Sequence, residues 1–395
     1  MADSTAILVL GMHRSGTSAA AGWLQALGVS FGSYFTAEDP TQPKGYFEHP
    51  EILAIHEELM ATFNSSWDDP RPLPKAWEHD HRVAFFRAQL VEIIRRDLAT
   101  QPLWGAKDPR LCRLLPLWLA ILDELCVAVR AICVLRHPAE VAGSLENRNQ
   151  FSPDRSGLLW LRYVLEAEQH SRSVPRITVR YPDLLRDWRA EAQAVAKGLG
   201  IVWPKSYEEA APAVADFLER NLRHHESSSF DGFAPPLREW LVSAYGALQL
   251  RRGTDEHSRT ILDNIHGELV DDPFVAKIQS IAHPSFFNGE VSEGHSLYHL
   301  TFEYFYGTFF GYYSCQYYPW LYHFGLGFEY VYDAKDGVRG VYFYDPGLKT
   351  FLYTSPRLFP YFYDFGSNSW LFYYQGTSRY FYDFGSRGLF FSAPG

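Results

Sequence analysis

The sequence has little positive charge, few cysteines and no long apolar run, and each shortage excludes a class of protein. The formal net charge is −10, so no overall basic field would attract nucleic acid, and any anion site must be local. The 4 cysteines show neither metal-ligand spacing nor a dense disulfide pattern. No apolar stretch approaches the length of a membrane span, and no basic segment precedes the first apolar run. We therefore expect a protein of the reducing cytoplasm with no metal site, membrane span or nucleic-acid partner.

The length and the composition predict more than one domain. A chain of 395 residues exceeds one ordinary domain, and 47% apolar with 21% charged residues is typical of a globular protein. Changes of pattern along the chain divide it into three parts. These are an α/β domain (1–230), a helical extension and linker (231–300), and an aromatic-rich β-repeat module (301–395).

Short β-rich runs alternate with longer helical patterns in the first part. Residues 6–10, 128–136 and 176–181 have the composition of buried strands. Apolar residues recur at helical spacing in 17–28, 81–99, 158–172 and 188–200. This alternation predicts an α/β fold with a parallel sheet flanked by helices.

The last part is dominated by aromatic residues, 36 of the 65 in the chain. "FYDPGL" (343–348), "FYDFGS" (362–367) and "FYDFGS" (381–386) recur at a spacing of 19, and "LYHFGL" (321–326) resembles an earlier copy. A regular period indicates a repeated supersecondary unit, and the Gly-, Pro- and Ser-containing turns between aromatic runs are typical of hairpins. We expect an antiparallel β-meander.

The aromatic rings of this module have two interpretations. They can form the core of a thin β-structure, or they can form a surface that binds sugars or a partner. The tail also resembles an aromatic repeat module found at the ends of various bacterial proteins. We expect an accessory role in acceptor recognition, or in assembly with a partner or a second copy.

A loop with the sequence "GMHRSGTS" (11–18) joins the first strand to the first helix. Its two glycines allow a tight turn and close approach of the backbone, and the helix dipole favours an anion there. The backbone N–H groups expected to face the anion are those of Ser15, Gly16, Thr17 and Ser18.

This loop lacks the lysine of the nucleoside-triphosphate-binding P-loops. Thr17 occupies that place, and Arg14 is the only cation in the loop. The arrangement resembles the 5′-phosphosulfate loop of the sulfotransferases, which use 3′-phosphoadenosine 5′-phosphosulfate (PAPS). The resemblance implies that Arg14 neutralises the charge that develops as the sulfonyl group leaves. It also implies adenosine 3′,5′-bisphosphate as a product and no requirement for a metal.

A second segment, "VLRHPAEVAGSLENRN" (134–149), supports this resemblance. It resembles the 3′-phosphate motif of the family, in which an arginine ends a strand and a serine lies on the next helix. Arg136 and Ser144 take these places, and the guanidinium offers a planar donor fork for a phosphate. Arg148 lies four residues after Ser144, on the same helical face, and is expected to add to the site.

Further segments resemble bacterial sulfotransferases, and the resemblance covers about residues 5–226. They are "GYFEHPEI" (45–52), "WGAKDPRLCRLLPLW" (104–118), "VRYPDLL" (179–185) and "FLERNLRHHE" (217–226). The resemblance implies that Tyr181 belongs to the donor site. The late signature "RKGxxGDW" of the eukaryotic cytosolic branch is absent, which leaves the adenine contacts open.

The residue that removes the acceptor's proton is not given by the cytosolic branch, because Pro109 replaces its histidine. Other members use an early glutamate, and Glu48 fits that description as general base. His49 and His56 are the alternatives. Glu48 also has the simpler interpretation of a residue that starts a helix before Pro50.

Lys107 matches a lysine of the family and is expected to stabilise charge on the transferring group. An ordinary ion pair between Lys107 and Asp108 is the competing interpretation. Together the segments predict transfer of a sulfonyl group from PAPS to a hydroxyl, or an amine, by in-line displacement. The acceptor is expected to be a carbohydrate or a phenol.

Two other functions remain open. One is phosphoryl transfer by a variant P-loop kinase, which would need a displaced lysine and acidic groups that hold magnesium. The other is a carbohydrate-binding or partner-binding protein that acts through the repeats at 301–395.

Overall fold

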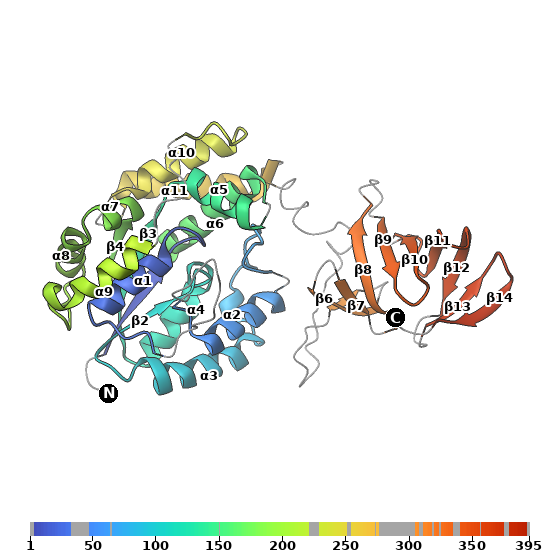
Figure 1. The fold of residues 1–395 in the computed structure, drawn as a ribbon, viewed down its shortest axis with the longest axis horizontal. Coiled ribbons are helices and arrows are strands. Elements are labelled where there is room, and N and C mark those ends of the chain that lie inside the picture. The colour runs from blue at the N-terminus through green and yellow to red at the C-terminus, as the bar shows by residue number, and fades with distance from the viewer. Residues whose placement is uncertain are drawn as a thin grey trace. The chain divides into compact units, whose positions relative to one another are not determined.

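The computed structural model of the chain describes residues 4–32, 47–63, 65–149, 151–220, 229–250, 254–272, 274–275, 305–307, 311–317, 320–323, 325–334, 340–355, 357–374 and 379–392. It consists of two compact units (Figure 1). Unit 1 comprises residues 1–60 and 66–276, and unit 2 comprises residues 61–65 and 277–395. The predicted boundaries at 230 and 300 stay predictions.

Unit 1 alternates strands and helices in chain order. Its strands are β1 (Thr5–Leu10), β2 (Leu103–Lys107), β3 (Ala128–Leu135) and β4 (Arg176–Arg180). The helices up to β4 are α1 (Thr17–Ala26), α2 (Pro50–Thr62), η1 (Trp77–His79), α3 (Val83–Ile93), the π-helical η2 (Ile94–Leu98), α4 (Leu111–Glu124), α5 (Pro138–Asn149) and α6 (Pro153–His170). After β4 follow α7 (Tyr181–Arg186), α8 (Trp188–Leu199), α9 (Tyr207–Arg220), α10 (Leu237–Leu248) and α11 (Glu256–Asp271).

The four strands form one parallel sheet in the order β2-β1-β3-β4, which confirms the predicted α/β fold. The register pairs Val9 with Lys107, Leu10 with Cys133, and Leu135 with Arg180. Because the strands are parallel and in this register, their carboxyl ends meet at one edge of the sheet. The predicted donor-site segments follow the strands at that edge.

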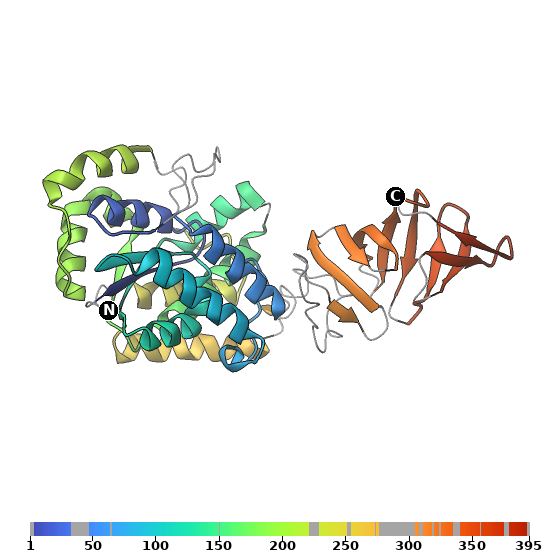
Figure 2. The ribbon, with the colours of Figure 1, turned by 90° about the horizontal axis from the view of Figure 1, so that it is seen from below.

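Helices cover both faces of this sheet (Figures 1 and 2). On one face α1, α8 and α9 share a buried core with β1, β3 and β4, which includes Trp23, Val179 and Val214. On the other face α4 and α6 pack on each other, and α10 packs on α6. Burial on both faces explains why β1 is almost wholly apolar.

The strands and helices predicted for unit 1 are present, but one further strand appears and one predicted helix is divided. Strand β2 was not expected, because its sequence, LWGAK, is short and contains Gly105. Its glycine lies where a Cβ would meet the Phe31 ring at 2.6 Å, so close packing requires it. The expected helix at 81–99 divides into α3 and η2. The predicted linker segment at 280–296 lies outside the described residues.

Unit 2 contains a ten-stranded antiparallel sheet in strictly sequential order, which confirms the predicted meander. Its strands are β5 (Phe305–Gly307), β6 (Gly311–Tyr317), β7 (Trp320–His323), β8 (Gly327–Asp333), β9 (Val341–Asp345), β10 (Thr350–Thr354), β11 (Tyr361–Asp364), β12 (Ser369–Tyr373), β13 (Tyr380–Asp383) and β14 (Gly388–Phe391).

Each sequence repeat corresponds to the end of one strand and the turn after it. Lys349, Asn368 and Arg387 occupy the same turn position and all have φ between 54° and 56°, the left-handed region. In the turn after β11, the Asp364 carboxylate accepts hydrogen bonds from the Gly366 N–H and the Ser367 hydroxyl. The period of 19 therefore reflects one hairpin with a side-chain-stabilised turn.

One face of the meander encloses a core of apolar residues contributed by strands from β7 to β13, including Leu321, Phe343 and Phe381. The buried guanidinium of Arg379 lies in the same interior. It donates to both carboxylate oxygens of Asp345 at 2.6 and 2.7 Å and to Glu329 Oε1 at 3.2 Å. It also donates to the carbonyl oxygen of Leu326, so Arg379 holds distant strands of the curled sheet together.

The aromatic residues serve both the interior and the surface of the module. Phe343 and Phe362 are buried and pack edge to face, with ring centroids 5.8 Å apart. On the opposite face, cross-strand pairs of half-exposed rings lie side by side. They include Trp320 with Tyr330, Tyr344 with Phe351, Tyr361 with Phe372, and Tyr380 with Phe391.

Candidate active site

The predicted anion loop lies between β1 and α1, at the carboxyl edge of the parallel sheet. Gly11, Arg14 and Gly16 have φ of 152°, 68° and 92°, so three of its residues adopt a left-handed backbone. The Gly11 N–H donates to the buried Cys112 Sγ at 3.0 Å, and the Ser15 N–H donates to the Met12 carbonyl oxygen at 3.1 Å. These contacts fix the loop where it leaves the strand.

Arg14 and Ser144 are in direct contact although 130 residues separate them in the sequence. The Arg14 Nε donates to the Ser144 Oγ at 2.9 Å. Arg136 joins them, because its NH1 donates to the Arg14 carbonyl oxygen at 3.0 Å. The strained backbone of Arg14 is therefore held by the arginine that ends the β3 segment, and the two predicted anion motifs form one cluster.

The other groups of this cluster hold Arg136 in place. Its Nε donates to Glu140 Oε2 at 2.7 Å, one turn along α5, and its guanidinium lies 5.0 Å from the centroid of the Tyr181 ring. Tyr181 in turn packs against the loop, because a Cβ on Gly16 would meet its ring at 2.2 Å. Tyr181 thus touches both anion motifs. Arg148 lies exposed further along α5.

The first turn of α1 begins at a residue that has no side chain. Gly16 is the N-cap, and it makes no side-chain hydrogen bond to the first N–H groups of the helix. The Ser15 hydroxyl is buried and has no hydrogen-bond partner among the described residues. Thr17 is buried and Ser18 is half-buried in the same turn. Ser15 is one of the four residues predicted to offer an N–H to the anion, but its N–H instead donates to the Met12 carbonyl oxygen within the loop. Its hydroxyl, which has no partner among the described residues, can bind an anion in its place.

Lys107 and Glu48 form a buried ion pair beside this loop. The Lys107 Nζ lies 2.6 Å from Glu48 Oε1, and Lys107 ends β2 next to Val9 of β1. Burial raises the pKa of the Glu48 carboxyl, and the attraction of Lys107 opposes but does not reverse this shift. Glu48 precedes α2, which begins at Pro50. The residues predicted as base and cation are therefore in direct contact, and their chemical roles stay predictions.

His56, one alternative base, has both ring nitrogens engaged. Its Nε2 accepts a hydrogen bond from the Trp118 indole N–H at 2.8 Å, so its Nδ1 must carry the proton that is donated to Asp108 at 2.7 Å. Burial opposes ionisation of Asp108, but Arg110 and His56 hold its pKa well below its usual range. His56 therefore orients Asp108 and has no free lone pair for a substrate.

His49, the other alternative, is buried and contacts the partly exposed Asp97. Its Nε2 lies 3.0 Å from Asp97 Oδ2, and its buried Nδ1 has no hydrogen-bond partner among the described residues. His49, Glu51 and Asp97 present ligand atoms within 4.8 Å of one another. Arg96 pairs with Glu51 at 2.5 Å and with Asp97 at 2.6 Å, so both carboxylates already neutralise a cation.

His13 was not singled out by sequence reasoning, although it lies inside the predicted loop. Its ring packs against Trp67, with centroids 4.6 Å apart, and against Tyr163 at 5.6 Å. Only the tertiary structure reveals this, because Trp67 and Tyr163 come from distant segments. The one feature of the sequence that points to His13 is its position directly before Arg14.

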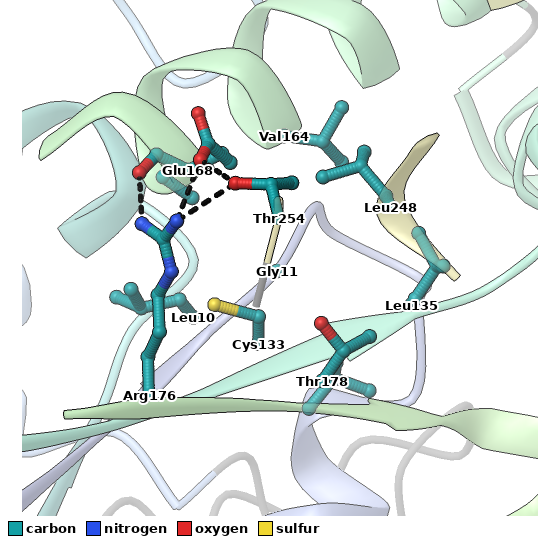
Figure 3. Close-up of a pocket in the computed structure, with 12 residues that line it drawn as sticks. Leu10, Gly11, Cys133, Leu135, Val164, Glu168, Arg176, Thr178, Leu248 and Thr254 are labelled. Carbon is teal, nitrogen blue, oxygen red and sulfur yellow. Dashed lines mark hydrogen bonds and ion pairs between the residues drawn. The ribbon is translucent and has the colours of Figure 1, made fainter. Parts of the chain in front are cut away.

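A small cavity lies on the α6 face of the sheet, and Gly11 at the start of the anion loop is among its lining residues (Figure 3). Its volume is about 30 Å³, and its polar rim is the cluster of Arg176, Glu168 and Thr254. Arg176 pairs with Glu168 at 2.6 Å, so these polar groups satisfy one another. None of the predicted site residues lines this cavity, which has room for about one or two water molecules.

Comparison with known proteins gives one match in sequence. The profile of the sulfotransferase family matches residues 6–205, which includes the loop, the β3–α5 segment and Lys107. No curated protein matches the chain significantly in sequence. None of the described helices is both long and apolar enough to cross a membrane.

Three of the solved structures that are similar to the chain are sulfotransferases or sulfotransferase domains. The sulfotransferase domain from the olefin synthase of Synechococcus PCC 7002 has a TM-score of 0.33 and 17% identity, covering 67% of this chain and 95% of that one. A sulfotransferase from Mycobacterium tuberculosis H37Rv has a TM-score of 0.33 and 17% identity, with coverages of 54% and 71%. The sulfotransferase domain from the curacin biosynthetic pathway has a TM-score of 0.32 and 13% identity, with coverages of 67% and 98%.

Proposed function

This chain belongs to the sulfotransferase family, and we propose that it transfers a sulfonyl group from PAPS to a hydroxyl group of an acceptor. The observation that carries the proposal is the single cluster of Arg14, Ser144 and Arg136 at the uncapped start of α1. Such a cluster suits a donor with two separate phosphate groups, since one binds the helix N-terminus and the other binds the arginine fork.

The residues of the loop would hold the 5′-phosphosulfate. The free Ser15 hydroxyl and the first N–H groups of α1 supply neutral donors, and Arg14 supplies the charge. The fit is supported by Gly16, where any side chain would collide with Tyr181. Arg136 and Ser144 would hold the 3′-phosphate, with Arg148 at its edge.

The proposed reaction breaks the sulfur–oxygen bond to the 5′-phosphate and forms a sulfur–oxygen bond to the acceptor. Adenosine 3′,5′-bisphosphate leaves, and the acceptor oxygen loses one proton. Arg14 would neutralise the charge that develops on the leaving phosphate oxygen, and Lys107 would stabilise the transferring group. A sulfate monoester is the second product.

Glu48 would take the proton as general base. Its raised pKa brings its basicity closer to the operating pH than that of an ordinary carboxylate. Its neighbour Lys107 orients it at 2.6 Å, and this contact must exchange for one with the acceptor hydroxyl or be shared with it. After transfer the proton passes from Glu48 to solvent.

The deciding experiment is calorimetric binding of adenosine 3′,5′-bisphosphate with a chelator present, followed by a transfer assay with radiolabelled PAPS. We expect binding without added metal and release of labelled product. Binding of ATP with magnesium in place of the bisphosphate would instead indicate a phosphoryl-transfer enzyme.

The meander is proposed to assist acceptor recognition or assembly, and the acceptor to be a carbohydrate or a phenol. Deletion of residues 301–395 is expected to change acceptor range or oligomeric state while bisphosphate binding persists. A cytoplasmic location is part of this proposal, since the described cysteines, Cys112, Cys126 and Cys133, are free thiols.

A further inference from the structure

His13 combines three features that its place in the loop does not require. Its Nε2 is shielded from solvent and has no hydrogen-bond partner among the described residues. Its ring packs against the rings of Trp67 and Tyr163, and these contacts limit the direction in which this nitrogen can point. It also directly precedes Arg14, the cation of the transfer site. A buried polar atom without a partner destabilises the fold unless it meets a ligand.

The surroundings of His13 keep its imidazole neutral. Burial lowers its pKa well below the ordinary 6.5, and Arg110, Lys107 and Arg148 add to the shift, while Asp108 opposes it. These groups come from β2, the loop before α4, and α5, and Tyr163 of α6 faces the ring as well. A neutral imidazole carries one N–H group, and the tautomer that places it on Nε2 can donate a hydrogen bond to an oxygen at that position.

We propose that His13 is the acceptor-binding residue of the site: its Nε2–H donates a hydrogen bond to the acceptor oxygen and holds that oxygen in line with the sulfonyl group, which leaves the hydroxyl proton to Glu48. This inference rests on the proposed function and names the acceptor side of the same site. His13 orients the hydroxyl and takes no proton, which passes to Glu48 during transfer. Its weak basicity suits binding rather than proton abstraction.

The same hydrogen bond selects a hydroxyl over an amine. An alkylamine is an ammonium ion at neutral pH and has no lone pair that could accept a hydrogen bond from Nε2–H, whereas the oxygen of a phenol or a sugar hydroxyl can accept it. The acceptor class is therefore a neutral hydroxyl compound.

The test compares three variants of the full chain: His13→Gln, His13→Asn and His13→Ala. Glutamine can place its amide near the Nε2 position, whereas asparagine reaches only the Nδ1 position and alanine neither. Each is measured for bisphosphate binding, for thermal unfolding, and for transfer of label from PAPS to a nitrophenol, methyl glucoside, butylamine and water.

We expect all variants to bind the bisphosphate within about twofold of the wild type. The KM for the hydroxyl acceptors should rise about tenfold in the Asn and Ala variants and much less in the Gln variant, as expected for one lost hydrogen bond. Release of sulfate to water should fall in the same order. The nitrophenol and glucoside arms show which hydroxyl source is used.

The outcomes separate this inference from the proposed function. A wild type that neither binds the bisphosphate nor releases labelled sulfate overturns the proposed function. Binding and transfer with an unchanged acceptor KM and unchanged hydrolysis in the Asn and Ala variants overturns the role of His13. Unfolding of all three variants makes His13 a structural residue and also overturns it. Preference for butylamine over both hydroxyl compounds contradicts the hydroxyl selection.

Discussion

The Nε of Arg14 donates a hydrogen bond of 2.9 Å to the Oγ of Ser144, which joins the predicted anion loop to helix α5. The two residues are proposed to serve different phosphates of one donor. Their contact means that the two halves of the proposed donor site are aligned with each other in the structure without a donor. Prearranged groups bind with a smaller entropy cost than groups that must be ordered.

A double-mutant cycle tests this alignment. Arg14→Ala and Ser144→Ala should each weaken bisphosphate binding, and the double variant should lose less than the sum because the residues share one interaction. We expect a coupling energy of about 1 kcal/mol, measured by calorimetry. Thr260→Ala, an exposed position on α11, is the matched control for hydroxyl removal. Strict additivity would mean that the contact plays no part in binding.

Glu48→Gln should remove the general base while keeping the shape of the side chain. We expect kcat to fall by about 10²–10⁴-fold, with bisphosphate binding unchanged. Glu58→Gln, an exposed change on helix α2, which begins two residues after Glu48, is the control. A variant with more than a tenth of wild-type kcat would assign the base elsewhere, with His49 as the next candidate.

The rate of transfer should depend on pH through Glu48. Because its pKa is raised above 4.5, its active ionised form is lost as the pH falls through the raised value. We expect kcat/KM to decline on the acid side with a midpoint above that of an ordinary glutamate. In Glu48→Gln this acid limb should vanish. A wild-type profile that stays flat down to the ordinary carboxylate range contradicts the assignment.

Gly16→Ala should abolish donor binding. The new Cβ would lie 2.2 Å from the Tyr181 ring, at a residue whose φ of 92° also disfavours a side chain. The double variant Gly16→Ala/Tyr181→Ala should recover only part of the affinity, because it relieves the collision and leaves the strained backbone. Gly143→Ala, which meets nothing within 4 Å, is the control. Full recovery in the double variant would show that the backbone strain has no effect.

Glu329 should make the meander less stable as the pH rises. Burial and the neighbouring Asp345 raise its pKa well above 4.5, so its protonated form is favoured in the folded state. That contribution is complete below the unfolded pKa and is lost as the pH rises through the folded one. Hydrogen exchange of residues 320–392 in the full chain should show protection falling over that range. Glu329→Gln should flatten the dependence, and the exposed Glu256→Gln should not.

The sequence was sufficient for those parts of the fold that are encoded locally. Strands β1, β3 and β4 follow from apolar runs, and the meander follows from its period. Strand β2 cannot be predicted from its own sequence, because LWGAK is short and has few apolar residues. Its pairing with β1 involves residues about a hundred positions away in the chain. Such partners are fixed by packing rather than by local pattern.

The candidate site likewise combines residues that local motifs indicate with contacts that only the folded chain determines. Arg14, Arg136 and Ser144 can be proposed as site residues from the sequence because they lie in compact motifs. The pairing of Lys107 with Glu48 spans 59 residues, and the direction of the Glu48 pKa depends on burial, which only the folded chain determines. The engagement of both nitrogens of His56 and the clamped ring of His13 are likewise tertiary properties.

The meander has a consequence for how such a module can change. Each described strand pairs only with its neighbours in the chain, so nearly every contact of the ladder is local. Local contacts close short loops, and sheets of this kind can form hairpin by hairpin. Gain or loss of one 19-residue unit would leave the remaining pairings intact, provided that the partners of Arg379 are kept. The number of hairpins in the meander can therefore vary. The smallest module that keeps the buried ion pairs is one that contains Arg379 together with Asp345 and Glu329.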